Sequence, residues 1–218
     1  AYAARMARSV GIDWLLAPVV DIGYQSPAFC EVPMSVAHLA GDYVAGVANG
    51  GALNCVKYFP GVSGILKTLA QMEDAEFVPY KHMFRRCDAI MPSDMVFANI
   101  DSSSRAMMSD KIIKELLKKR LNYKGCVVGA PLYKSRIKHE AAAALKMIGC
   151  GVEMILAPQN AGAVLDAVEK EFDKGSILDA FIRSVSSQEM LISKGLTSAA
   201  YLFSPKEAFE MARNFKKS

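Results

Sequence analysis

Several residue patterns that would point to a particular class of protein are missing from this sequence. There is no C-x-x-C pair, and the cysteines are odd in number and widely spaced: Cys30, Cys55, Cys87, Cys126 and Cys150. This spacing argues against a disulfide framework and for buried thiols in a reducing compartment, so we expect a cytoplasmic protein. No apolar run approaches the ~18 residues that a membrane-spanning helix needs, so no membrane span is expected.

Signatures for nucleotide, metal and nucleic-acid binding are also absent. The sequence contains no G-x-G-x-x-G pattern and no Walker loop, so we expect no cofactor of that kind. His38, His82 and His139 share no ligand spacing with a carboxylate or a cysteine, which predicts no metal site. The formal net charge is only +4, and the dense basic runs 118–120 and 216–217 lie at predicted helix ends, where they complement helix dipoles. No nucleic-acid partner is therefore expected.

The sequence does contain an alternation of short apolar segments and helical patterns. Continuous apolar strands separated by helices are typical of a parallel sheet buried on both faces. Right-handed crossovers then give either a doubly wound sheet or a barrel. The predicted strands are 13–22, 53–59, 89–96, 126–132 and 152–158, and the predicted helices are 1–10, 33–49, 66–87, 109–122, 135–149, 160–174, 176–193 and 205–216. Because the residue before a proline is disfavoured in a helix, a break before Pro79 is left open, and residues 99–105 are expected to form a serine-rich loop. No linker divides the chain, so we expect one domain over residues 1–218.

The second predicted strand organises the expected site. It runs from Leu53 to Phe59, carries Lys57 and Tyr58 near its end, and is followed by a Pro-Gly turn. An apolar strand with a polar end is how a barrel delivers functional groups to its rim. The first strand similarly finishes with Asp21, and Asp94 comes near the end of the third.

Five segments in register resemble one family, glycoside hydrolase family 3. Residues 14–22 resemble its "aPVlDi" segment, 57–61 its "KHFPGHG" motif, 88–95 its "daIMpaHv" strand, 109–125 its "lS..ii..lLR..lgfdG" helix and 149–156 its "aGcDmiL" strand. The nearest branch is the bacterial β-N-acetylglucosaminidase type. The resemblance implies a (β/α)8 TIM-barrel-like domain, with parallel strands inside and helices outside, that is incomplete at the N-terminus because the first strands would precede Ala1. It also implies a carbohydrate ligand of the N-acetylglucosamine type.

The resemblance is incomplete at the positions that carry the family's chemistry. Ala130 occupies the position of the nucleophilic aspartate. The loop after Gly61 is short and lacks the acid/base histidine, and the loop after Ile22 lacks the sugar-binding arginine. Tyr58 and Asp94 stand where the family has histidines. A retaining glycosidase needs both a nucleophile and an acid/base, so the resemblance implies impaired or absent catalysis with a residual sugar-binding site.

Several interpretations of the individual residues stay open. Lys57 binds a sugar, or it forms an ion pair with Asp21 or Asp94 at the rim. Asp94 is a new general acid/base or, as we favour, the salt-bridge partner of Lys57. Asp21 is expected to cap the following loop. Tyr133 is a substitute nucleophile or, as we favour, a packing residue or a platform for a sugar ring.

Three functions follow from these alternatives. The first is a degenerate glycosidase that binds carbohydrate through Lys57, Tyr58, Asp21 and Asp94. The second is an active β-N-acetylhexosaminidase with rewired residues, Asp94 and Tyr133. The third is a structural or partner-binding barrel, because missing strands would leave edges for an oligomer or a partner segment to complete. Finally, Glu73, Asp74 and Glu76 are expected to form a solvated acidic helix face.

Overall fold

A computed structural model describes residues 1–23 and 28–195. Its centre is a parallel sheet with the order β1-β2-β3-β6, formed by Trp14–Leu15, Leu53–Phe59, Ala89–Pro92 and Cys126–Val127. The order follows the chain without a reversal. Doubly wound sheets reverse their strand order at the centre, whereas barrel sheets do not, so the observed order is that of a barrel-type α/β fold.

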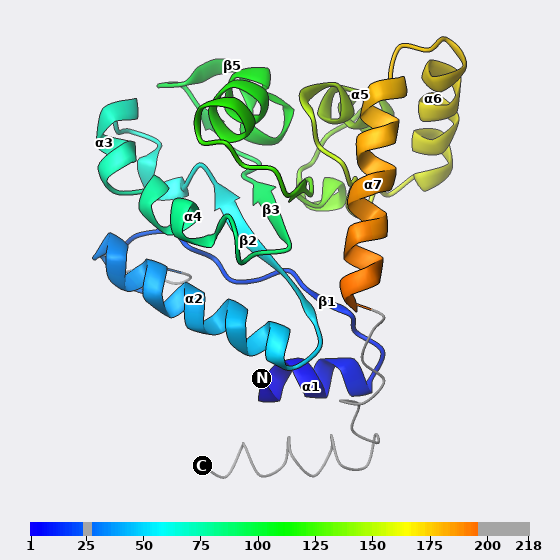
Figure 1. Ribbon diagram of the computed structural model, residues 1–218. Helices are drawn as coiled ribbons and strands as arrows, with labels where there is room; N and C mark the ends of the chain where they lie inside the picture. The colour runs from blue at the N-terminus through cyan, green and yellow to red at the C-terminus, as the bar shows by residue number, and fades with distance from the viewer. Residues whose placement is uncertain (24–27, 196–218) are drawn as a thin grey trace.

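Helices pack against the central strands of this sheet. Helices α2 and α4 pack against each other and against β2, and α7 also contacts β2. In Figure 1, α2 and α4 lie on one side of the central strands, and α5, α6 and α7 lie on the other. The α-helices are α1 (Tyr2–Ser9), α2 (Pro33–Asn49), α3 (Leu69–Asp74), α4 (Phe77–Met83), α5 (Glu140–Cys150), α6 (Ala161–Asp173) and α7 (Leu178–Gly195).

Strand β2 is where the sequence predicts the structure most closely. Its predicted and observed bounds agree, and residues 53–56 are fully buried. Phe59 has no exposed surface and lies between Phe77, with a ring-centroid distance of 6.0 Å, and the edge of Tyr80, at 5.1 Å. The strand therefore forms the centre of the core up to its last residue.

Four of the five predicted strands are shorter than predicted. The strands at 89–96 and 126–132 are regular only over β3 and β6. The first predicted strand is regular only at β1 and then pairs once more, through the bridge between Val19 and Lys57. The predicted strand at 152–158 is reduced to a single parallel bridge between Val128 and Met154. Within the described residues the first and the last of these segments pair on one side only.

The helix predicted at 66–87, for which a break before Pro79 is left open, is divided in the structure. It forms α3 and α4, which are separated at residues 75 and 76, because Ala75 leaves the helical region with φ −128° and ψ −83°. The helix predicted at 135–149 begins only at Glu140, after a 3-10 turn at Leu132–Lys134. The helix predicted at 109–122 is observed as a π-helix, Lys111–Arg120, with Ser109 Oγ accepting from the Ile112 N–H.

The prediction of a loop at 99–105 is wrong. This serine-rich stretch contains one strand of an antiparallel hairpin. Strand β5 (Asp101–Arg105) pairs with β4 (Val96–Phe97). Asp101 accepts hydrogen bonds from Ser103 and Ser109, which lower its pKa to about 2. These hydrogen bonds hold the end of the hairpin against the start of the π-helix. The predicted helix at 205–216 lies outside the described residues.

The fold predicts a sharp contrast in stability between two apolar side chains. Phe59→Ala removes a fully buried ring and should lower the free energy of unfolding by about 3–5 kcal/mol. Leu66→Ala, at a side chain that is 95% exposed, should change it by less than about 0.5 kcal/mol. Urea unfolding of both variants measures this difference, and equal losses would contradict the placement of β2 in the core.

Candidate functional site

The end of β2 presents a lysine and a tyrosine at the edge of the core. Lys57 and Tyr58 are half-buried, and the Lys57 ammonium lies 5.1 Å from the centroid of the Tyr58 ring. The peptide bonds Lys57–Tyr58 and Phe59–Pro60 are cis. Within the described residues Lys57 forms no ion pair, so the predicted pairing with Asp21 or Asp94 is wrong. Its ammonium keeps its hydrogen-bonding capacity for a ligand or water.

Asp21 lies beside this segment and holds the turn that follows it. Its Oδ1 accepts a 2.7 Å hydrogen bond from the Val62 N–H, in agreement with the predicted structural role of Asp21. The residue is only 9% exposed, and burial raises its pKa from 3.8 to about 6. The Val62 N–H opposes this rise, and the nearby charge of Glu76 adds to it. Asp21 is therefore a carboxyl group that titrates near neutral pH.

The prediction that Glu76 is solvated is wrong. The residue is buried, with 1% of its surface exposed. Its Oε1 accepts hydrogen bonds from Lys67 Nζ at 2.5 Å and from Ser63 Oγ at 3.0 Å. Helical spacing in the sequence does not predict this burial, because Glu76 lies at the break between α3 and α4 and Met72 belongs to the other helix.

The short loop after Gly61 is held tightly against Glu76. Gly61 has a φ of 109°, and a Cβ there would lie 2.9 Å from Glu76 Cγ. A Cβ on Gly64 would lie 2.5 Å from Met72 Cε. From the other side, the Asn99 amide in the β4–β5 turn donates to the carbonyl oxygens of Gly64 and Lys67. The loop that follows the Lys57 motif is thus a packed part of the rim.

Asp94 pairs with an arginine that the sequence did not single out. Its Oδ1 lies 2.6 Å from Arg105 NH1, and the same nitrogen donates to the Ser135 carbonyl at 3.0 Å. Both side chains are about one-third exposed. Arg105 reaches this position because it belongs to β5, an element that the sequence predicted as loop. The Arg105 side chain connects the segment after β3, through Asp94, with the segment after β6, through Ser135.

In the segment after β6, position 130 is an alanine, whereas the family resemblance predicts a nucleophilic carboxylate there. Ala130 is 3% exposed and lies in a continuous described segment. Tyr133 is 48% exposed, and Lys134 Nζ lies 5.5 Å from its ring centroid. Tyr133 is therefore a surface residue and not a core packing residue. Among the described residues no cluster of histidine, cysteine, aspartate or glutamate could hold a metal ion.

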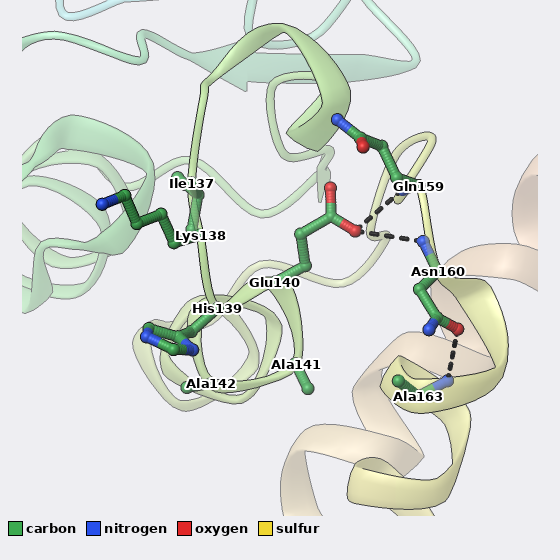
Figure 2. Close-up of a pocket in the computed structure, with 9 residues that line it drawn as sticks. All are labelled: Ile137, Lys138, His139, Glu140, Ala141, Ala142, Gln159, Asn160 and Ala163. Atoms are coloured by element: carbon green, nitrogen blue, oxygen red, sulfur yellow. Dashed lines mark hydrogen bonds between the residues drawn. The ribbon is translucent and has the colours of Figure 1, made fainter.

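A cavity of about 530 Å³ lies where the chain enters α5 and α6. Figure 2 shows Glu140 between Lys138 and His139 on one side and Gln159 and Asn160 on the other. Glu140 Oε2 accepts from the backbone N–H groups of Gln159 at 2.8 Å and Asn160 at 3.1 Å. Sequence reasoning did not find this cavity, because its two walls are 17 or more residues apart.

Fold and site define the class of protein. It is an α/β protein whose parallel sheet is wound in barrel order and carries its polar residues beyond the carboxyl ends of the strands. Residues 1–188 match the glycosyl hydrolase family 3 N terminal domain, and the chain belongs to this family. The resemblance stated from the five sequence segments is thereby confirmed.

The relatives include bacterial β-hexosaminidases. The protein from Neisseria meningitidis serogroup C is 28% identical over an alignment of 192 positions, which covers 74% of this chain and 50% of the relative. That from Thioalkalivibrio sulfidiphilus is 30% identical over an alignment of 196 positions, which covers 78% of this chain and 55% of the relative. The solved β-N-acetylglucosaminidase from Paenibacillus sp. superposes with a TM-score of 0.82 at 22% identity, covering 99% of this chain and 48% of that one. The chain spans about half the length of the relatives it matches. Within residues 1–23 and 28–195, none of the helices combines the length and apolar character needed to cross a bilayer.

The raised pKa of Asp21 predicts a pH-dependent stability. Above pH 4 the unfolded chain ionises this carboxyl, while the folded chain keeps it protonated up to about pH 6. The stabilisation is therefore complete below pH 4 and is lost as the pH rises through 6, by about 3 kcal/mol relative to Asp21→Asn. Urea unfolding of both proteins between these pH values measures it; a pH-independent difference would contradict the buried placement of Asp21.

Proposed function

We propose that this chain is a sugar-binding domain related to β-N-acetylglucosaminidases, in which the family's own covalent mechanism has been lost. The ligand is a saccharide of the N-acetylglucosamine type. The observation that carries the proposal is the buried methyl group of Ala130 at the position that the family motif gives to the nucleophile. A methyl group can neither attack an anomeric carbon nor stabilise a positive charge there.

Four residues form the proposed sugar site: Lys57, Tyr58, Asp21 and Asp94. Lys57 supplies donors without an intramolecular ion pair, and the Tyr58 ring beside it offers an apolar face. Asp21 accepts hydrogen bonds when ionised and orients the Gly61–Val62 turn in either state. Asp94 acts together with Arg105, because their 2.6 Å contact fixes the direction of both groups.

We further propose that the chain is a single domain and that its sheet is part of a (β/α)8-type barrel. The uninterrupted strand order and the superposition on barrel relatives support this proposal. In the described residues, β1 and the segment around Met154 each pair on one side only. A further segment or a second subunit would satisfy those edges.

A second candidate function is hydrolysis of a β-N-acetylhexosaminide by rewired residues. It is favoured by the exposure of Asp94 and Tyr133, which are both open to a ligand, unlike Ala130. Asp94 would serve as the acid or base and Tyr133 as the nucleophile. The 2.6 Å contact with Arg105 counts against this role, because it already engages the Asp94 Oδ1 that would exchange a proton with the substrate.

Loss of the lysine should weaken sugar binding selectively. In isothermal titration with N-acetylglucosamine, Lys57→Ala should lower the affinity about tenfold or more, because a charged donor to a ligand hydroxyl is removed. Lys124→Ala, at an exposed lysine that precedes β6, is the matched control and should bind like the parent chain. No heat of binding from the parent chain at millimolar sugar would contradict the proposed function.

Turnover distinguishes the second candidate from the first. We expect no release of nitrophenol from nitrophenyl β-N-acetylglucosaminide above the rate in buffer. Activity that is present in the parent chain and lost in Asp94→Asn or Tyr133→Phe would establish the rewired hydrolase. Activity that is unchanged in both variants would remove these two residues as its catalysts.

A further inference from the structure

The loop between β6 and α5 is strongly cationic. Residues 134–139 read Lys-Ser-Arg-Ile-Lys-His, and the side chains of Lys134, Arg136, Lys138 and His139 are all exposed. Across the described ranges no carboxylate lies within ion-pair distance of Lys134, Arg136 or Lys138. Several unpaired cations on one short loop create a positive potential that attracts an anionic ligand.

The loop is held in place beside the proposed sugar site. Arg105 donates to the Ser135 carbonyl and pairs with Asp94, so one side chain fastens the cationic loop to the segment that follows β3. Ser135 Oγ also donates to the Pro131 carbonyl at 3.0 Å, within the same loop. Because Ala130 precedes the loop without a charge, no carboxylate at this position opposes the cations.

The cavity of Figure 2 lies directly beyond this loop. Lys138 and His139 form part of its wall, and the amides of Gln159 and Asn160 form another part. Glu140 is the only acid among the lining residues. Its Oε2 accepts from two backbone N–H groups at the start of α6, and its Oε1 is buried without a hydrogen-bond partner among the described residues, so it can accept from a ligand hydroxyl group. The positive charge lies on the loop wall, where the Lys138 side chain is exposed beside Lys134 and Arg136 of the same loop.

The size and lining of the cavity indicate more than a bare anion. A volume of about 530 Å³ lies within the range of small-molecule sites. Gln159 and the Asn160 amide nitrogen offer hydrogen bonds to hydroxyl groups, while Ile137, Ala142 and Ala163 supply apolar surface. Carboxamides beside a small apolar patch suit the alternating hydroxyl and C–H surface of a sugar ring.

We propose that this cavity and the cationic loop bind an anionic saccharide, a sugar ring that carries a carboxylate or a phosphate group. The inference deepens the proposed function, on which it rests, by adding a second binding position with its own charge preference. Lys134, Arg136 and Lys138 attract the anionic group, and the two amides bind the ring. A neutral N-acetylglucosamine unit binds instead at the proposed site around Lys57.

The test is isothermal titration of the full 218-residue chain with four probes. N-acetylglucosamine 1-phosphate and glucuronic acid carry the two candidate anionic groups, N-acetylglucosamine is the neutral sugar, and inorganic phosphate is the anion alone. Charged sugars should bind about tenfold more tightly than the neutral sugar, and raising the salt from about 0.05 M to about 0.5 M should weaken only the charged ones. Equal affinity for inorganic phosphate and the sugar phosphate would overturn the saccharide part of the inference.

Two matched pairs of variants locate the binding. The double variant Lys134→Ala/Lys138→Ala should weaken charged sugars about tenfold, whereas Lys81→Ala/Lys124→Ala, with the same change in charge at other exposed lysines, should not. Ala142→Trp, which fills the cavity from an exposed position, should abolish binding of charged sugars. Ala45→Trp on α2 is its control.

The outcome is separable from that of the proposed function. Charged sugars that bind to Lys57→Ala as they do to the parent chain, but not to Ala142→Trp, support the inference even if the Lys57 site fails. Neutral sugar that depends on Lys57, with no binding of charged sugars, overturns the inference and leaves the proposed function intact. Charged sugars that bind equally to Ala142→Trp and Ala45→Trp also overturn it.

Discussion

The burial of β2 is the constraint on which the rest of the structure depends. Residues 53–56 are all buried, and the one polar side chain among them, Asn54, donates through its amide and its backbone N–H to Asp88 Oδ2. Phe59 continues the core to the end of the strand, where it packs on Phe77 and Tyr80. Lys57 and Tyr58 are consequently the first side chains along β2 that reach the surface of the core. The polar end of this strand is thus a direct consequence of how deeply its beginning is buried.

Two buried carboxylates give the rim its shape. Glu76 binds Lys67 and Ser63, and Asp21 binds the Val62 N–H, so the turn after β2 is fixed from two directions. The two acids also influence each other, since the charge of Glu76 contributes to the raised pKa of Asp21. Carboxylates in these positions are structural first. They hold the loop that in the family motif carries the catalytic histidine, although this loop contains none.

The balance of charge at the rim is the ground on which binding, and not the family's own chemistry, is proposed. A retaining mechanism places two carboxyl groups on either side of the scissile bond. In this chain position 130 is an alanine, Asp94 is paired with Arg105, and the cations of the loop that follows have no ion-pair partner among the described residues. The proposed ligands, a neutral and an anionic saccharide, follow from these charges.

The sequence by itself determined the alternation of strands and helices, the family, the bounds of β2 and the loss of a carboxylate at position 130. These features depend on local periodicity or on residue identity, which a single chain displays directly. Only the tertiary structure decided that Glu76 is buried, that Asp94 pairs with Arg105 and not with Lys57, and that residues 137–142 meet 159–163 around a cavity. The physical reason is that each of these contacts joins side chains from separate elements. Their proximity depends on strand order and on the hairpin formed by β4 and β5, neither of which is visible in the spacing of residues along the chain.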